Sequence, residues 1–428
     1  MYTAAVLRNS KEKTKQETAG LVMKRFVRVM ALLLCVCSAG VLGGIAYTDA
    51  VTAQAFTVSV GETLRLPSAM VSVREQGAWQ TCTREGGEYD ATVSLFGIFP
   101  VREVSVNVEE RPDAAVCGMP FGIKMFTQGV LVVGLSDVDS RQGAKSPARS
   151  AGLRVGDSIL SIDGQEVSTT AQVASIVENS KGYPLRLRVR RAQVEFDVTL
   201  TPLASVKEQC LKAGMWVRDS AAGIGTLTFY DVTSGVFGGL GHPVNDADTG
   251  ERVPISSGEI VPATIFGVTK GQVGSPGELL GSFRKGSWGV LMNNVDTGLY
   301  GVLSEQPDAW ATLPIAYKQE VTEGKAQMIT TVAGDRPIAY NIEIEKVDYR
   351  DGVPTQNMVI RVTDDVLLEA TGGVLCGMSG SPIVQNGKLV GAVTHVFVGD
   401  PTRGYAIFAE NMLSSARSLV MPMQEDAA

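Results

Sequence analysis

The sequence predicts a mainly β protein with one apolar segment near its N-terminus. Beyond residue 50, short runs of alternating apolar and polar residues are separated by glycine and proline, which is typical of antiparallel strands and turns. Residues 29–47 contain no charged residue and are long enough to cross a bilayer. The length of 428 residues and the hydrophobic content of 44% are sufficient for two or three packed domains.

The N-terminal segment indicates an exported protein. The basic run 24–28 precedes the apolar residues, as expected when the N-terminus stays on the cytoplasmic side. We expect residues 23–50 to form an uncleaved membrane anchor; the alternative is a signal peptide cleaved near Ala53-Gln54-Ala55. Met23 directly precedes the basic run, so residues 1–22 are interpreted as a mis-called start or a disordered extension.

Charge and cysteine usage exclude other classes. A net charge of −7 gives no support for nucleic-acid binding. The cysteines lack metal-ligand spacing, and we expect no metal and no cofactor. A disulfide between Cys82 and Cys117 could close a loop in the first exported domain, and Cys376 is expected to be a small buried residue.

Two domains are expected between the membrane segment and the C-terminal half. Residues 51–117 alternate in polarity and predict a small β domain without chemistry of its own. In residues 150–167, an Ala-Gly-Leu helix end is followed by a strand and an Asp163-Gly164 hairpin turn. This pattern resembles a PDZ domain, which we place at residues 118–203, with a helix at 171–179 beside its groove.

A PDZ domain binds an extended peptide by adding it to an exposed strand edge. The resemblance therefore implies a peptide ligand, a carboxylate-binding loop and an edge strand beginning at residue 130. The expected groove residues are Thr127, Gln128, Gly129, Val130, Leu131 and Val132.

Residues 377–382, Gly-Met-Ser-Gly-Ser-Pro, are the most informative stretch of the chain. They resemble the nucleophile turn of chymotrypsin-like serine peptidases. Glycine at 377 allows the N–H groups of Gly377 and Ser379 to point into one oxyanion hole, and Gly380 leaves room for the substrate. The short strands of residues 204–428 favour the paired antiparallel barrels of such a peptidase.

A serine nucleophile needs a general base, and the chain contains only two histidines. His242 follows the strand-like run 224–230 and is flanked by glycine and proline, so it is our candidate base. His395 lies on the strand just after the nucleophile hairpin and is expected to line the substrate cleft. The third member should be a carboxylate. Spacing leaves Asp364, Asp365, Asp246 and Asp248 as alternatives.

Long motifs connect the chain to one family. The run 371–397, the Gly-His-Pro motif at 241–243 and the run 94–101 resemble the stage IV sporulation protein B peptidases. Matched position by position, the resemblance implies a triad of His242, Asp364 and Ser379. Asp365 follows Asp364 where a proline or neutral residue is expected, which leaves a one-position ambiguity.

The chymotrypsin-like layout also suggests the substrate contacts. Gly373, six residues before the nucleophile, would lie at the base of the specificity pocket, which favours a small or apolar P1 side chain. The remaining expected contacts are Thr394, His395, Val396, Gly404 and Tyr405.

The family resemblance implies a role in sporulation signalling. It implies an exported, membrane-anchored serine endopeptidase, or one released into the forespore intermembrane space. This enzyme would cleave itself and a membrane-bound regulator of an intramembrane protease, and so trigger processing of a late sigma factor. Two alternatives remain open: an Htr-like quality-control protease, and a PDZ interaction protein without catalysis.

Overall fold

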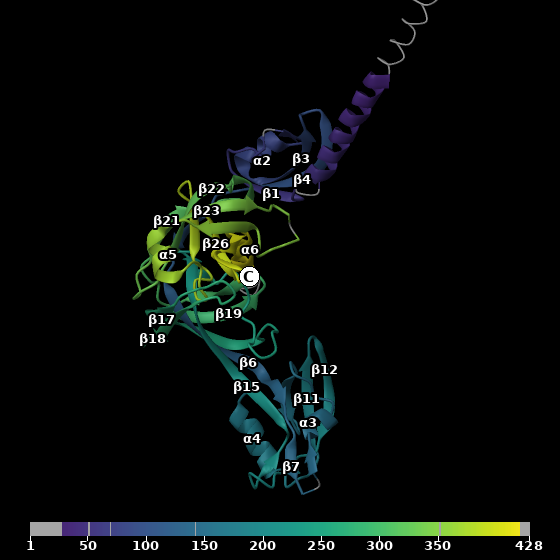
Figure 1. Cartoon of the computed structure of the whole chain (residues 1–428), viewed down its shortest axis with the longest axis vertical. Coiled ribbons are helices and arrows are strands. Elements are labelled where there is room, and N and C mark those ends of the chain that lie inside the picture. The colour runs from purple at the N-terminus through teal and green to yellow at the C-terminus, as the bar shows by residue number, and fades with distance from the viewer. Residues whose placement is uncertain (1–27, 50–51, 69, 142, 351, 420–428) are drawn as a thin grey trace, which may run out of the picture. The chain divides into compact units, whose positions relative to one another are not determined.

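The computed structural model describes residues 28–49, 52–68, 70–141, 143–350 and 352–419. The chain divides into two compact units, Met1–Glu109 and Glu110–Ala428. The prediction of a mainly β chain is confirmed: the first unit contains a four-stranded sheet, and strands dominate the second unit (Figure 1). Most of the basic run, residues 24–27, and the interpreted extension 1–22 lie outside the described residues.

Among the described residues, one helix, Arg28–Asp49, is long and apolar enough to cross a membrane. At about 1.5 Å per residue, its 22 residues are sufficient to cross a hydrocarbon core about 30 Å thick. Its apolar stretch is not buried in the protein. A signal sequence near the N-terminus has the same length and composition, so the helix is compatible with membrane attachment and with a signal segment.

The first unit also contains a four-stranded sheet in the order β1-β4-β3-β2. These strands are β1 (Ala55–Ser59), β2 (Val71–Glu75), β3 (Gly87–Leu95) and β4 (Phe99–Glu109), with the short helix α2 (Trp79–Glu85) between β2 and β3. Alternate residues of β3 and β4, such as Val93 and Val106, are fully buried. The predicted alternation therefore forms one apolar face and one solvated face.

The second unit begins with a six-stranded ring in the order β6-β17-β19-β20-β16-β15, which pairing between β15 and β6 closes. Its strands are β6 (Pro120–Leu135), β15 (Met215–Tyr230), β16 (Val236–Gly239), β17 (Ile255–Thr269), β19 (Gly289–Val295) and β20 (Gly298–Leu303). Phe121, Leu227 and Phe237 fill its core. β5 (Asp113–Val116) pairs with β15 and with β21 (Ala311–Pro314), while β18 (Glu278–Phe283) pairs with β17.

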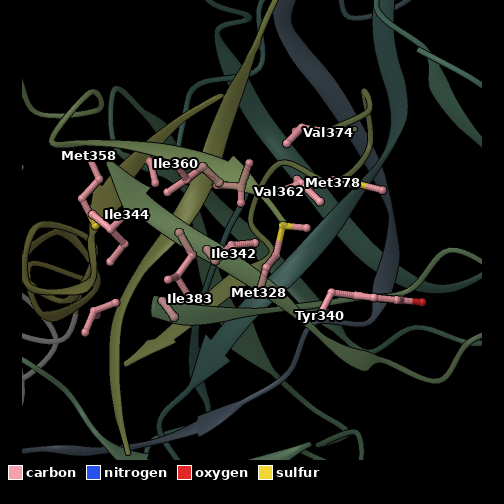
Figure 2. Close-up of a cluster of buried hydrophobic side chains, with 14 of the residues drawn as sticks. Met328, Tyr340, Ile342, Ile344, Met358, Ile360, Val362, Val374, Met378 and Ile383 are labelled. Atoms are coloured by element: carbon pink, nitrogen blue, oxygen red, sulfur yellow. The ribbon is translucent and has the colours of Figure 1, made fainter. Parts of the chain in front are cut away.

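The C-terminal part forms a second closed barrel in the order β22-β23-β24-β27-β26-β25. Its strands are β22 (Gly324–Thr330), β23 (Ile338–Val347), β24 (Met358–Val362), β25 (Pro382–Gln385), β26 (Lys388–Phe397) and β27 (Asp400–Phe408). Figure 2 shows its apolar interior, where Ile342, Ile360 and Met328 are fully buried. The 3-10 turn η1 (Lys318–Glu320) precedes this barrel, α5 (Asp365–Thr371) leads into the nucleophile turn, and α6 (Ala409–Arg417) follows β27.

The PDZ-like module lies in sequence between the first two long strands of the first barrel. Its elements are β7 (Val138–Ser140), β8 (Gly143–Lys145), α3 (Pro147–Ser150), β9 (Ser158–Ile162), β10 (Gln165–Glu166), α4 (Thr170–Asn179), β11 (Leu185–Arg191), β12 (Val194–Leu200), β13 (Leu203–Ala204) and β14 (Leu211–Lys212). A side-chain and backbone capping box at Thr169 and Gln172 starts α4. Asp163 and Gly164 adopt positive φ, as the predicted hairpin turn requires.

The strand pairing differs from the boundaries drawn from the sequence. Residues 120–127 of β6 pair with β15 and β17 in the first barrel, whereas residues 130–135 pair within the PDZ-like sheet. β6 and β15 therefore run side by side through both modules (Figure 1). Burial along β6 alternates from Ile123 to Gln128 and is continuous from Val130 to Val132, with Gly129 at positive φ between the two parts.

All six cysteines are free. The suggested bridge between Cys82 and Cys117 is therefore wrong: Cys117 is fully buried in the core of the first barrel. Cys376 is exposed rather than buried. Its neighbours Leu375 and Met378 supply the apolar contacts at this turn instead.

Candidate active site

A cleft of about 440 Å³ lies between the two barrels, both of which contribute to its walls. Its lining from the first barrel and its loops consists of Ile123, Met125, Ala221, Ala222, Gly223, Ile224, Leu240, His242, Pro243, Val244 and Asn245. The second barrel and its nucleophile turn add Val374, Leu375, Cys376, Gly377, Ser379, Thr394, His395 and Val396. The serine of the predicted nucleophile turn and the predicted base thus face one cavity.

The nucleophile turn is held by strand β15. The N–H of Thr226 donates to the carbonyl of Ser379 at 3.0 Å, and its hydroxyl donates to the carbonyl of Gly377 at 2.9 Å. The hydroxyl of Thr228 donates to the carbonyl of Gly380 at 2.7 Å. These two threonines were missed in the sequence, where they are only the polar positions of an apolar strand. Their contacts fix the turn from the opposite barrel.

The two N–H groups expected to form the oxyanion hole are available. Neither Gly377 nor Ser379 donates its N–H to any acceptor among the described residues, while the intervening Met378 donates to Leu375. Gly377 has φ +97° and Gly380 has φ +93°. A Cβ on Gly380 would lie 2.1 Å from the carbonyl oxygen of Thr226, so only glycine fits there.

The hydroxyl of Ser379 donates to the carbonyl oxygen of Thr394 at 2.8 Å. It therefore makes no hydrogen bond to His242 in this structure. Hydrogen bonds between catalytic groups are often absent or long before substrate binds. A rotation about χ1 of Ser379 changes the acceptor of the hydroxyl without moving the backbone.

His242 is held in one tautomer by its own loop. Its Nδ1 lies 2.8 Å from the carbonyl oxygen of Pro243. Because a carbonyl only accepts, Nδ1 carries the proton and Nε2 is left as a proton acceptor. Burial lowers the pKa of His242 to about 4; the contact with Pro243 opposes this shift, and nearby His395 adds to it. His242 is therefore neutral at neutral pH, as a general base must be.

His395 lies on β26 and contributes to the cleft wall with Thr394 and Val396. Burial lowers the pKa of His395 as well. The hydroxyl of Thr394 donates to the carbonyl of Thr355 at 3.0 Å, and the backbone carbonyl of Thr394 accepts from the hydroxyl of Ser379.

The structure does not bring Asp364 to His242. One oxygen of Asp364 accepts from the N–H groups of Val366 and Leu367 at the start of α5, and the other accepts from the backbone N–H of Asn341 at 3.2 Å. Asp364 is thus the N-cap of α5 and does not line the cleft. The assignment of Asp364 as the acid of a triad rests on the family resemblance alone, and substitution of Asp364 tests it.

The other candidate acids also have separate roles. Asp246 is 3% exposed, forms an ion pair with Arg218, and accepts from the N–H groups of Asp248 and Thr249. These contacts lower the pKa of Asp246 against the opposing effect of burial, which is the largest single influence. Asp365 is exposed in the first turn of α5. None of the described carboxylates hydrogen-bonds to His242.

Three predicted substrate contacts lie outside the cleft lining. Gly373 is buried against Pro401, where a Cβ would lie 2.1 Å from the carbonyl oxygen. Gly404 packs against the carbonyl of His395, and Tyr405 stacks edge-on against Phe397. Gly373 therefore does not form the base of this cleft. The lining is instead mostly apolar.

The predicted peptide groove is also corrected. Val130 and Leu131 pair with β9 on one side, and Leu131 and Val132 pair with β15 on the other. Gln128 donates its N–H to Pro254, and a Cβ on Gly129 would lie 2.5 Å from the carbonyl oxygen of Ile159. Residues 130–132 therefore belong to an interior strand, and residues 127–129 lead into it. This segment has no free edge that could accept a peptide.

The open edge next to α4 belongs to β15. Among the described residues, Met215–Arg218 pair only with β6. Val132 uses its N–H and carbonyl toward Asp157 and Gly156, so its partner Val217 directs its own N–H and carbonyl away from β6. The N–H of Thr170, at the start of α4, donates to Asp219 at 2.8 Å.

No group of three or more His, Cys, Asp or Glu side chains in the described part of the chain could hold a metal ion. The cleft brings together the serine, the histidine and backbone N–H groups. Two barrels with these groups in the cleft between them define a serine peptidase of the chymotrypsin-like type, joined to a PDZ module.

Comparison with known families agrees with this class. Residues 209–413 match the SpoIVB peptidase S55 model, and residues 138–191 match a PDZ domain model. Residues 209–413 are therefore similar to peptidases of the SpoIVB S55 family, and residues 138–191 are similar to PDZ domains. Both matches support a serine peptidase that acts on protein or peptide segments.

Similarity to individual proteins is more limited. The zinc metalloprotease RasP of Geobacillus kaustophilus is 26% identical over 103 residues, 19% of this chain and 24% of that protein. The regulator of sigma-E protease RseP of Salmonella typhimurium is 35% identical over 68 residues, 16% of this chain and 15% of that protein. The solved inactive form of the Rv3671c protease is 16% identical with a TM-score of 0.24, covering 45% of this chain and 81% of that one.

Proposed function

We propose that this protein is an exported serine endopeptidase of sporulation signalling, with Ser379 as nucleophile and His242 as general base. It cleaves itself and a membrane-bound regulator of an intramembrane protease, and so triggers processing of a late sigma factor. The S55 family match supports the sporulation role. The apolar helix Arg28–Asp49 supports export, with the protein anchored in or released into the forespore intermembrane space.

One observation carries the catalytic proposal: Ser379, neutral His242 and two unbonded N–H groups face the same cleft. Ser379 turns its hydroxyl from Thr394 to Nε2 of His242, which takes the proton as Oγ attacks the scissile carbonyl. The oxyanion accepts from the N–H groups of Gly377 and Ser379. His242 then protonates the leaving amine, and water hydrolyses the acyl-enzyme by the same steps in reverse order.

The cleft favours an apolar substrate side chain next to the scissile bond. Its walls include Ile123, Ile224, Val374 and Leu375, and none of its lining residues is an acid or a permanently charged base. A basic P1 side chain would lose its hydration without gaining a partner. The strand β26 offers backbone groups beside the cleft for an extended substrate.

The PDZ module recruits a second extended segment. We place this peptide on the free edge of β15 at Met215–Arg218, beside α4, in place of the edge first expected from the sequence. Backbone hydrogen bonds to Val217 would supply affinity, as in other cases of strand addition. The ligand is either the regulator or an extended part of a second copy of this chain.

The test is N-terminal sequencing of the full chain, expressed beside its Ser379→Ala form. Wild-type protein should show new N-termini, and the variant should remain intact. If both forms show the same new N-termini, cleavage comes from another protease and the proposed self-processing is wrong. Addition of the Ser379→Ala protein as substrate for the wild type then reports whether cleavage occurs between copies.

A further inference from the structure

The hairpin between β17 and β18 reaches across from the first barrel to the nucleophile turn. The N–H of Leu279 donates to the carbonyl of Cys376 at 2.9 Å, and the N–H of Cys376 donates to the carbonyl of Gly277 at 2.9 Å. The N–H of Gly271 donates to Thr371 at 2.9 Å, and the Lys270 ammonium donates to the carbonyl of Glu369 at 2.6 Å. The hairpin therefore holds the chain segment that leads from α5 to Ser379.

Two of these bonds surround the peptide unit between Cys376 and Gly377. In a trans peptide the carbonyl and the following N–H point in opposite directions. Because Leu279 holds the Cys376 carbonyl toward the hairpin, the N–H of Gly377 must point away from the hairpin. That N–H has no acceptor among the described residues and belongs to a residue that lines the cleft.

Close packing at this contact explains glycines both in the hairpin and in the segment that faces it. A Cβ on Gly377 would lie 3.1 Å from the Cβ of Leu279. A Cβ on Gly277 would lie 2.1 Å from the carbonyl oxygen of Thr269, and one on Gly372 would lie 2.5 Å from the carbonyl oxygen of Gly271. The Gly-Ser-Pro-Gly run at 274–277, which resembles a nucleophile turn in the sequence, is thus the tip and return of this hairpin.

We propose that the β17–β18 hairpin is the positioning element of the oxyanion hole, and that the Leu279 N–H sets the direction of the Gly377 N–H. Loss of this bond leaves the Cys376–Gly377 peptide free to rotate about its flanking φ and ψ angles. Rotation by half a turn would present the Cys376 carbonyl, an acceptor, to the developing oxyanion. The barrier to reaction would rise although Ser379 and His242 remain in place.

The geometry offers a clean way to remove this bond. Leu279 pairs with Val268 of β17, but its N–H donates to the carbonyl of Cys376. The N–H is therefore not one of the hydrogen bonds between β17 and β18. An amide-to-ester replacement at Leu279 removes the donor and keeps the side chain. The matched control is the same replacement at Val273, at the hairpin tip, which is 78% exposed and has no acceptor for its N–H among the described residues.

The experiment measures labelling of Ser379 in the full chain by an alkyl fluorophosphonate. Oγ bonds to phosphorus while the P–F bond breaks and fluoride leaves, His242 takes the hydroxyl proton, and the phosphoryl oxygen enters the oxyanion hole. We expect the Leu279 ester to lower the second-order labelling rate by about 10²-fold, close to the loss of one oxyanion donor. The Val273 ester should label at the wild-type rate. The pH at which the labelling rate falls to half its maximum on the acid side should not change, because the surroundings of His242 are unchanged. An unchanged pH profile distinguishes a positioning role of Leu279 from partial unfolding of the site.

The inference rests on the proposed serine mechanism, and the two fail separately. Labelling of the Ser379→Ala protein at the wild-type rate would contradict the nucleophile assignment itself. If Ser379→Ala is unlabelled but the Leu279 ester labels like the wild type, the mechanism stands and the positioning role is overturned. Equal losses for the Leu279 and Val273 esters would also overturn it, because the effect would then not depend on the bond to Cys376.

Discussion

The imidazole rings of His242 and His395 lie 4.8 Å apart, centroid to centroid, with 36° between their planes. They come from different barrels, since His242 follows β16 and His395 lies on β26. A proton on one ring disfavours a proton on the other at this distance. The second histidine of the chain thus contributes to the low pKa of the first, in addition to lining the cleft.

The first prediction concerns the pH dependence. Because burial and His395 lower the pKa of His242 to about 4, the base stays neutral well below pH 6.5. Activity should therefore fall in acid only as the pH approaches about 4, rather than around 6.5. His395→Gln removes the neighbouring charge and should move this acid limb to higher pH. The measurement is kcat/KM or fluorophosphonate labelling against pH, and a limb at the same pH in both proteins would contradict the coupling.

The second prediction separates the two serines of the turn. Ser379→Ala should lower hydrolysis by several orders of magnitude while thermal stability stays nearly unchanged. Ser381 is fully buried and shares a 2.9 Å hydrogen bond with Thr330. Ser381→Ala should instead cost about 1 kcal/mol of stability and retain activity. Activity and thermal unfolding of both variants decide this, and the opposite pattern would move the nucleophile to Ser381.

The sequence leads to Ser379 and His242, which the structure places in one cleft, because the patterns that suggest them are local. Glycines beside a serine mark the turn, and a count of only two histidines leaves two candidates for the base. The alternation of apolar residues likewise predicts strands, but not their partners. Thr226 and Leu279 lie 153 and 100 positions before Ser379 in the chain, and no local pattern marks them as neighbours of the turn.

The PDZ groove was misplaced for a related physical reason. A strand rich in valine, such as 130–133, can lie at the edge or in the interior of a sheet. The apolar side chains show that a face of the sheet is buried, but not whether the strand has a neighbour on each side. Only the pairing with β9 and β15 shows that it is interior. The acid presents the same difficulty, since an N-cap and a triad member are both aspartates at the end of a strand.

The third prediction tests Asp364. Its contacts are those of an N-cap, and asparagine caps a helix as well as aspartate does. Asp364→Ala should therefore lower the free energy of unfolding by about 1 kcal/mol, whereas Asp364→Asn should keep both stability and a hydrolysis rate within a few-fold of wild type. A fall of about 10⁴ in kcat for the asparagine variant, with stability unchanged, would show that the carboxylate reaches His242 during catalysis.

The fourth prediction tests the free edge of β15. Val217 directs its N–H away from β6, so Val217→Pro removes a donor that only an added strand would use. Proline is tolerated on an edge strand when its missing N–H faces outward. We expect the variant to fold with wild-type stability and to label at Ser379 with the wild-type rate, while its affinity for extended peptides falls at least tenfold.

Val130→Ala, in the neighbouring interior strand, is the matched control and should lower stability without changing peptide selectivity. Binding is measured by fluorescence anisotropy with a panel of peptides ending in apolar residues. Peptide affinity that Val217→Pro leaves unchanged would show that the ligand uses another surface of the PDZ module.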